Sequence, residues 1–371
     1  MLPVAPAVDV APRPRLQLLD LLRFGAALAV VMYHYTARRH TQWEAPTIET
    51  FPFVSQFSAY GFMGVQLFFL ISGFVILMSV EGRSVGEFVA ARISRLFPAY
   101  WAAVILTAIL IEFIAGDQLG KSVTLVQVLT NLTMLQQWTG VPHVDGVYWT
   151  LAVELLFYVL IGIFMSTKLT VEKITWLAFL WPLAALIADR SNMQFLATFL
   201  SPAYAPLFAA GMMLYVIYSR GSNLLRWMLV VGNGILGTQQ TIMYDVANAE
   251  RLTGVDLKEP VAVAIMILIF ASVALVTLSP LQSRGLAWMT YLGALTYPLY
   301  LVHELWGWWV IGQLSPYLNE WVVLVLAIAF VLLLAAAIER WVERRSRRWL
   351  RTQVLRSFPR AERAPAAAAA R

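Results

Sequence analysis

The sequence contains no cysteine and few charged residues. The absence of cysteine excludes disulfide scaffolds, thiolate metal sites, iron–sulfur clusters and cysteine nucleophiles. Only 13% of the 371 residues are Asp, Glu, Lys or Arg, whereas a soluble globular domain carries about a quarter. The sequence also shows no metal-ligand spacing and no phosphate-binding glycine loop. These deficits exclude most soluble enzyme folds and predict that no metal is bound.

Apolar residues are abundant and occur in long runs. They make up 60% of the chain, and the mean hydropathy is +0.70. A bilayer core of about 30 Å requires roughly 20 apolar residues in a helix. Runs of this kind cover residues 17–36, 60–80, 97–115, 147–166, 174–189, 199–219, 225–243, 260–279, 286–312 and 321–338. We therefore predict an all-α, polytopic integral membrane protein with about ten transmembrane helices.

Two segments are less apolar than the others. The run 225–243 is interrupted by Asn233, Gln239 and Gln240, which makes it the weakest of the predicted spans. Segment 123–138 alternates leucines with glutamines and an asparagine, so we expect it to lie along the membrane interface rather than across it.

The positions of Lys and Arg predict the orientation of the chain. With the N-terminus in the cytoplasm, most of them, including the arginine-rich C-terminal segment, fall on the inner side. Both termini are therefore predicted to be cytoplasmic, in a multi-pass protein of the cell (inner) membrane. We expect a disordered segment at 1–16, a transmembrane domain at 17–340 and a basic, Ala- and Arg-rich tail at 341–371. The net charge of +6 then indicates contact with membrane lipid and not with nucleic acid.

Ionisable residues within the first predicted span are candidates for function. A charge at bilayer depth costs at least a few kcal/mol, and such residues are rarely kept without a role. Arg23 and His34 are eleven residues apart, which places them within about 20° of the same helix face and about 16 Å apart along the axis. Asp20 precedes Arg23 by one turn, a spacing suited to an ion pair. The alternative is a snorkelling arginine and a packed histidine.

The same residues carry a resemblance to a known family. Leu19-Asp20-Leu21-Leu22-Arg23 followed by His34 resembles the opening helix of the acyltransferase 3 family, which is marked by an arginine, ten residues and a histidine. Further similar blocks follow in order at residues 64–74, 88–100, 148–158 and 292–303. Thr150 and Gln66 depart from the pattern, since serine and an acidic residue are usual there. The resemblance implies a membrane O-acyltransferase whose domain covers residues 17–340.

Acyl transfer from a thioester to a hydroxyl requires a base in a site that excludes water. His34 is the candidate base, because an unperturbed imidazole with a pKa near 6.5 is largely neutral at pH 7. Glu154 lies in the outer half of the fourth predicted span, where it would orient His34 or bind the acceptor. An ion pair between Glu154 and Arg23 is the alternative.

An anionic donor would suit the cytoplasmic side. Arg92 and Arg95 are one turn apart, and guanidinium groups bind phosphate in a fork geometry. Together with Arg23 they would hold the phosphates of coenzyme A while its arm extends toward His34. The alternative is that Arg92 and Arg95 only reflect the positive-inside rule. The family resemblance implies acyl-CoA as the donor, with acetyl-CoA as the main candidate.

Aromatic and histidine side chains are candidates for the acceptor site. His303 lies in the outer half of the ninth predicted span with Tyr300 one turn earlier, so both would line an acceptor pocket or pack in the core. Tyr148 and Trp149 would form a platform for a sugar ring or anchor the interface. The resemblance implies that the acceptor is an extracytoplasmic carbohydrate or glycoconjugate.

A multi-pass transporter or exporter of a glycan or small solute is the alternative function. Transporters commonly have two related halves with broken helices at matching positions. We find no such pairing in the sequence, so the acyltransferase prediction is preferred.

Overall fold

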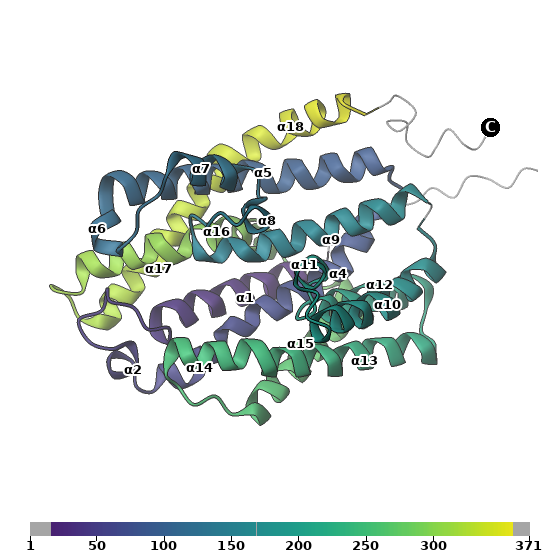
Figure 1. Cartoon of the computed structure of the whole chain (residues 1–371), viewed down its shortest axis with the longest axis horizontal. Helices are drawn as coiled ribbons and strands as arrows, with labels where there is room; N and C mark the ends of the chain where they lie inside the picture. Colours follow the sequence, from purple (N-terminus) through teal and green to yellow (C-terminus); the bar gives the residue numbers. More distant parts are fainter. Residues whose placement is uncertain (1–15, 168, 359–371) are drawn as a thin grey trace, which may run out of the picture.

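The computed structural model describes residues 16–167 and 169–358, and every regular element within these ranges is helical. The all-α prediction is therefore confirmed. Most of the disordered segment predicted at 1–16, together with residues 359–371 of the predicted tail, lies outside the described residues. The long helices, many of which run in similar directions (Figure 1), are α1 (Gln17–Thr36), α4 (Gly64–Val80), α5 (Val85–Ile109), α9 (Trp149–Ser166), α10 (Val171–Arg190), α12 (Ala205–Arg220), α13 (Leu224–Gln240), α15 (Glu259–Leu278), α16 (Ala287–Leu314) and α17 (Glu320–Ile338).

Eight helical segments of the described chain are long and apolar enough to cross a membrane. Each of them contains or overlaps one of the predicted spans. The other two predicted spans, 225–243 and 286–312, form α13 and α16, which are not among these eight segments. At 28 residues, α16 is about 42 Å long, enough to span the hydrocarbon core. The structure is thus consistent with a polytopic membrane protein, and the count of ten spans remains a prediction.

Short helices connect the long ones near the site. Between α1 and α4 lie α2 (Thr47–Thr50), α3 (Val54–Ser58) and the 3-10 segment η1 (Ala59–Met63). Between α5 and α9 lie α7 (Leu125–Leu132), α8 (Gln136–Thr139) and the 3-10 segment η3 (Gly146–Tyr148). The eight residues of α7 extend about 12 Å and are too short to cross a bilayer. Leu125 and Val126 of this helix are exposed, and the interfacial position of the segment stays a prediction.

Glycines let α4 approach two neighbouring helices at close range. A side chain at Gly64 would collide with the backbone of Ala26 in α1, and one at Gly73 would collide with the backbone of Phe208 in α12. Small residues at helix contacts are typical of membrane proteins, where van der Waals packing drives association. Helix α4 is therefore held between α1 and α12.

Helix α1 is also fixed against α16. Near the first residues of both helices, Gln17 Nε2 donates to Thr290 Oγ1 over 3.2 Å. Near the end of α1, Tyr35 Oη donates to the carbonyl oxygen of His303 over 2.5 Å. These two contacts tie α1 to α16 along most of its length, with α4 packed against α1 as well.

The first part of the predicted tail is not a separate segment. Helix α17 continues through the π-helical segment η6 (Glu339–Glu343) into α18 (Arg344–Arg356), and Figure 1 shows α18 beside α5. Phe358 approaches Gly86 at the start of α5, and Leu350 of α18 is buried. The boundary predicted at residue 341 therefore falls inside a continuous helix, because apolar residues of α18 pack against the rest of the protein.

Candidate active site

A cavity of about 240 Å³ surrounds His34, and we call it the His34 cavity. Helices α1, α4, α9 and α16 contribute to its wall, together with the connection after α1 and the segment that follows α13. Its polar lining comprises His34, Arg38, Gln66, Asp245, Asn248 and Glu304. Polar side chains from distant parts of the sequence therefore converge on one space.

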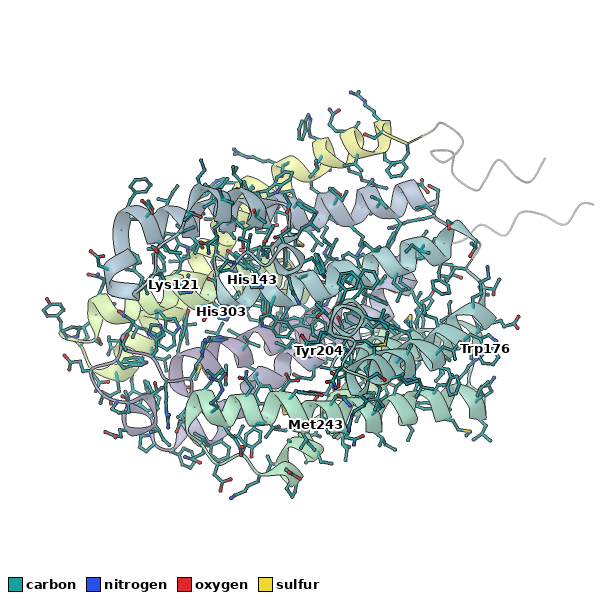
Figure 2. All side chains as sticks on the ribbon, viewed as in Figure 1. Lys121, His143, Trp176, Tyr204, Met243 and His303 are labelled. Carbon is teal, nitrogen blue, oxygen red and sulfur yellow. The ribbon has the colours of Figure 1, made fainter. Side chains whose placement is uncertain are left out.

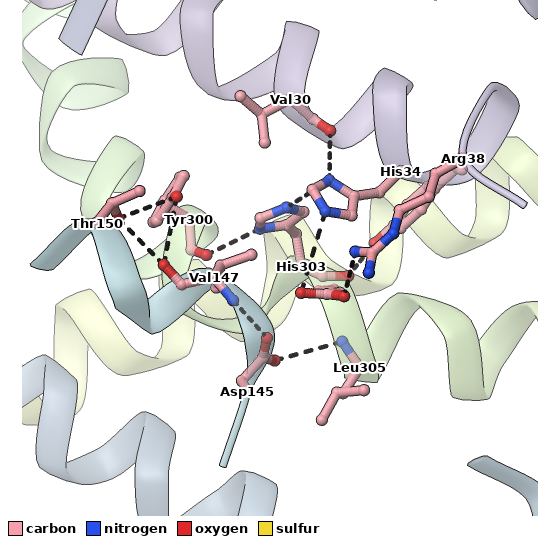
Figure 3. Close-up of polar contacts among 11 residues, drawn as sticks. Val30, His34, Arg38, Asp145, Val147, Thr150, Tyr300, His303 and Leu305 are labelled. Carbon is pink, nitrogen blue, oxygen red and sulfur yellow. Dashed lines mark hydrogen bonds and ion pairs between the residues drawn. The ribbon is translucent and has the colours of Figure 1, made fainter. Parts of the chain in front are cut away.

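His34 presents one unoccupied ring nitrogen. Its Nδ1 lies 2.8 Å from the carbonyl oxygen of Val30 (Figure 3). A carbonyl oxygen can only accept a hydrogen bond, so Nδ1 carries the proton in the neutral ring and Nε2 keeps its lone pair. The side chain is almost fully buried, and Nε2 faces Glu304. His34 is thus arranged to accept a proton at Nε2.

His303 lies behind His34 and does not line the His34 cavity. Its Nδ1 is 2.8 Å from the carbonyl oxygen of Tyr300, and its Nε2 is 3.3 Å from Nδ1 of His34 (Figure 3). The ring is completely buried. For His303, the structure therefore supports packing in the core and does not support contact with an acceptor. Tyr300, predicted with it, does line the cavity.

Glu304 is the acidic neighbour of His34. Its Oε2 lies 4.0 Å from His34 Nε2, and its Oε1 accepts a hydrogen bond of 2.6 Å from Arg38 Nη1 (Figure 3). Oε2 is buried and has no hydrogen-bond partner among the described residues. A buried carboxylate needs a counter-charge, and Arg38 supplies it. Oε2 therefore remains directed toward the imidazole.

Sequence reasoning missed Glu304 and Arg38 as site residues. Two signals were present: Glu304 is an ionisable residue within a predicted span, and Arg38 follows His34 by one helical turn. Neither signal shows that the two side chains meet, because 266 residues separate them.

Asp145 secures the turn beside Glu304. Its Oδ1 accepts from the backbone N–H of Val147 over 3.2 Å, and its Oδ2 accepts from that of Leu305 over 3.4 Å. Burial, followed by the nearby charge of Glu304, raises the pKa of Asp145 well above its usual range. The side chain links η3 to α16 and holds Gly146 against the Glu304 carboxylate.

A second cavity, of about 80 Å³, contains the predicted donor residues, and we call it the Arg23 cavity. Arg23 from α1 and both Arg92 and Arg95 from α5 line it. The guanidinium of Arg92 lies 5.9 Å from the ring centre of Phe88 and 5.8 Å from that of Tyr158. Cation–π contacts of this kind hold the guanidinium in place.

Glu154 lies in the Arg23 cavity and does not line the His34 cavity. Its Oε1 accepts hydrogen bonds of 2.9 Å from Ser72 Oγ and 2.6 Å from Tyr158 Oη. The structure therefore does not bring Glu154 and His34 together. The reason is the position of Glu154 along the chain. Gly146 lies next to Glu304, and Glu154 follows Gly146 by eight residues, or about 12 Å along a helix axis. With three arginines and one carboxylate, the Arg23 cavity favours an anion.

The two cavities meet at shared residues. Val65 of α4 and Tyr300 of α16 line both of them. Tyr300 Oη lies 3.0 Å from Oγ1 of Thr150. Arg23 and His34, separated along α1 as their spacing predicts, thus reach adjoining spaces.

The two aromatic residues at the start of α9 have different surroundings. Trp149 lines the His34 cavity, and its ring centre is 5.2 Å from that of Tyr204. Tyr148 is completely buried, with its ring centre 5.2 Å from that of Tyr100 in α5. Trp149 therefore fits the predicted platform, whereas Tyr148 is neither a platform nor an interface anchor, because it points toward α5.

The chemistry of the two cavities is complementary. One holds a histidine whose Nε2 has no hydrogen-bond partner among the described residues, beside a carboxylate, and the other holds three arginine side chains. Within residues 16–167 and 169–358, no three His, Asp or Glu side chains are grouped so that they could hold a metal ion. The arrangement can remove a proton from a bound hydroxyl close to an anion site.

Comparison with known proteins defines the class. The fold and the site are those of a multi-pass membrane protein with a buried histidine in one of two polar cavities that share lining residues. The model of the acyltransferase 3 family, described as an acyltransferase domain, matches residues 16–340. The chain therefore belongs to the acyltransferase 3 family.

Two curated proteins are similar to parts of the chain. Acyltransferase MdmB of Streptomyces mycarofaciens is 25% identical over 172 residues, covering 44% of this chain and 43% of the relative. Exopolysaccharide production protein ExoZ of Rhizobium meliloti (strain 1021) is 35% identical over 107 residues, covering 26% of this chain and 32% of the relative. The chain thus matches less than half the length of each of these relatives. No solved structure is significantly similar to it.

Proposed function

We propose that this protein transfers an acyl group, most simply acetyl, from cytoplasmic acyl-CoA to a hydroxyl of an extracytoplasmic carbohydrate or glycoconjugate. The observation that carries the proposal is the free Nε2 of His34 in a cavity that adjoins the Arg23 cavity. One relative is named an acyltransferase and another an exopolysaccharide production protein, which supports a carbohydrate acceptor.

Arg23, Arg92 and Arg95 would bind the phosphates of the donor. Guanidinium groups pair with phosphate in a bidentate manner, and all three line one cavity. Its volume of about 80 Å³ is below the roughly 300 Å³ of a typical small-molecule site. We therefore expect the arginine side chains to move apart when the donor binds. The thioester would then reach His34 past Val65 and Tyr300.

His34 would act as the general base. Its Nε2 takes the proton from the acceptor hydroxyl as the oxygen attacks the thioester carbonyl carbon. The carbon–sulfur bond breaks, and the leaving sulfur of coenzyme A receives the proton from His34, which yields an ester and a free thiol. Glu304, whose Oε2 is 4.0 Å from Nε2, would stabilise the imidazolium while it exists.

The His34→Ala variant tests the proposal. Two measurements are made. Consumption of acetyl-CoA is followed with purified protein in lipid nanodiscs, and acetyl groups on surface glycans of expressing cells are measured by mass spectrometry. General base catalysis contributes about 100- to 10,000-fold, so we expect a loss of at least about 100-fold with little change in melting temperature. His143→Ala, which alters a histidine that lines neither cavity, is the control.

Three results would contradict parts of the proposal. A folded His34→Ala protein that acylates at the normal rate refutes the base assignment. A parent protein that never consumes acetyl-CoA refutes acyl-CoA as the donor. If that protein instead moves solute across the bilayer, the transporter alternative is correct.

A further inference from the structure

The His34 cavity contains a second polar cluster that the acyl-transfer step does not use. Asp245 Oδ2 accepts a hydrogen bond of 2.8 Å from Gln66 Nε2, and Asp245 Oδ1 accepts one of 3.0 Å from Tyr204 Oη. All three side chains line the cavity. Tyr204 is labelled near the middle of the view in Figure 2.

Asp245 and Gln66 can accept further hydrogen bonds. An ionised carboxylate offers about four acceptor positions, and the two hydrogen bonds to Asp245 leave others open. The Oε1 of Gln66 is buried and has no partner among the described residues. Buried polar atoms in native proteins are almost always paired, so an unpaired amide oxygen in a cavity wall indicates that a ligand donates to it.

The backbone around Asp245 is arranged to bring this residue to the cavity. Asp245 lies in the π-helical segment η4 (Thr241–Val246), which joins α13 to α14 (Ala247–Thr253). A π-helical turn shifts the register of a helix, and such turns occur frequently at functional sites. This segment is independent of α1 and α16, which carry His34 and Glu304.

The other lining residues, the volume and the net charge of the His34 cavity restrict the kind of ligand that it can bind. Trp149 lines the same cavity, and a flat aromatic ring suits the apolar face of a sugar. The volume of about 240 Å³ is below the roughly 300–1,000 Å³ of a drug-sized site, so one ring fits rather than a chain of rings. Arg38 and Glu304 neutralise one another, which leaves the Asp245 carboxylate as a net negative charge. An acidic sugar would be repelled.

We propose that Asp245, Gln66 and Tyr204 form the acceptor-recognition subsite, which we call the Asp245 subsite. It binds neighbouring hydroxyls of a single neutral sugar ring, stacked on Trp149, and thereby presents a further hydroxyl to Nε2 of His34. This inference rests on the proposed function and assigns its acceptor specificity to named residues.

Asp245→Asn and Gln66→Leu test the subsite. Asparagine keeps the size of the side chain, and its Oδ1 can still accept from Tyr204. Its other terminal atom, Nδ2, is a donor and cannot accept a hydrogen bond. Two acetyl transfers are measured from acetyl-CoA: one to surface glycans in cells, read by mass spectrometry, and one to hydroxylamine in nanodiscs, which needs no sugar site. Losing a hydrogen bond to a charged group corresponds to about a tenfold or larger effect. We therefore expect the ratio of glycan to hydroxylamine transfer to fall at least about tenfold in each variant.

Asp189→Asn is the matched control. Asp189 also accepts a hydrogen bond from a tyrosine, Tyr244 Oη at 2.7 Å, but it lines neither cavity. We expect the transfer ratio of this variant to equal that of the parent protein, with acetyl groups found on a neutral sugar.

Several outcomes would overturn the inference. An unchanged ratio in Asp245→Asn and Gln66→Leu removes the subsite, and so does an equal loss of both transfers in protein with a normal melting temperature. Acetyl groups found on a uronic or sialic acid refute the neutral-sugar assignment. Failure of the parent protein to use acetyl-CoA with either acceptor is a separate result, because it refutes the proposed function itself.

Discussion

At the scale of single residues, the site depends on which atom of each side chain remains free. His34 has its Nδ1 bound to the carbonyl oxygen of Val30, so its reactive nitrogen is Nε2. Glu304 has its Oε1 bound to Arg38, so its Oε2 faces the imidazole. The hydrogen bonds to Val30 and Arg38 thus position the proposed base, His34, and its acidic neighbour, Glu304.

Gly146→Ala should disturb this geometry. A Cβ atom at Gly146 would lie 2.8 Å from Glu304 Oε2, closer than such atoms approach in folded proteins, so the carboxylate must shift away from His34. We expect kcat to fall at least about tenfold, because a 1 Å displacement in a catalytic site can cost up to 100-fold. Steady-state rates with acetyl-CoA provide the measurement.

Gly162→Ala in α9, the helix that follows η3, is the control for Gly146→Ala. A Cβ atom there would meet nothing within 4 Å, so activity should be retained and stability should not fall, since alanine favours a helix. Normal turnover by Gly146→Ala would show that the position of Glu304 does not matter.

At the scale of elements, one sequence block acquires a structural explanation. The block 64–74, which resembles the family pattern, begins and nearly ends with glycines that touch the backbones of α1 and α12. Ridge-and-groove packing at this distance tolerates no larger residue. Part of the block is therefore needed to bring helices together, while Gln66 and Ser72 within it reach the cavities.

The connection after α1 should respond to pH through His40. Its ring stacks on that of Trp308 in α16, with ring centres 4.0 Å apart and planes 8° from parallel. Burial lowers the pKa of His40 to about 4, below the value near 6.5 of an unfolded histidine. As pH falls from about 6.5 to 4, the unfolded state takes up a proton that the folded state does not, so the folded state loses stability. Above pH 7 there is no such loss.

Thermal unfolding at pH 7.5 and pH 5 checks this expectation. His40→Gln, which cannot be protonated, should show a smaller drop in melting temperature than the parent protein. Burial also lowers the pKa of His143, so part of the drop should remain. An equal drop in both proteins would mean that the connection does not dock through a neutral His40.

At the scale of the whole molecule, the proposed transfer of an acyl group across the bilayer requires a defined orientation of the chain. The Arg23 cavity lies nearer the first residues of α1, and the His34 cavity lies nearer its last residues. If the N-terminus is cytoplasmic, the donor enters from inside and the acceptor binds outside. Loops must then alternate between the two sides of the membrane.

The absence of cysteine allows a direct test of this orientation. Glu44, after α1, and Ser222, after α12, are both exposed. In intact cells, a membrane-impermeant maleimide should label Glu44→Cys and leave Ser222→Cys unlabelled until the membrane is opened. The positive-inside rule is the physical reason, since Lys and Arg are retained on the cytoplasmic side. The reverse labelling pattern would invert the assignment of donor and acceptor sides.

The sequence by itself determined the helical class and the position of most elements. In lipid every backbone group must be bonded within its own segment, so long apolar runs become helices whatever surrounds them. It also brought out Arg23, Arg92, Arg95 and His34, because ionisable residues at bilayer depth and the order of the sequence blocks can be read locally.

Only the tertiary structure decided which helices face one another. Helical periodicity defines the face on which a side chain lies but not the element opposite that face. Glu304 rather than Glu154 therefore became the neighbour of His34, and Asp245 joined Gln66 across 179 residues. Such pairings follow from close contacts among α1, α4, α12 and α16, and contacts between distant segments leave no periodic signal in the sequence.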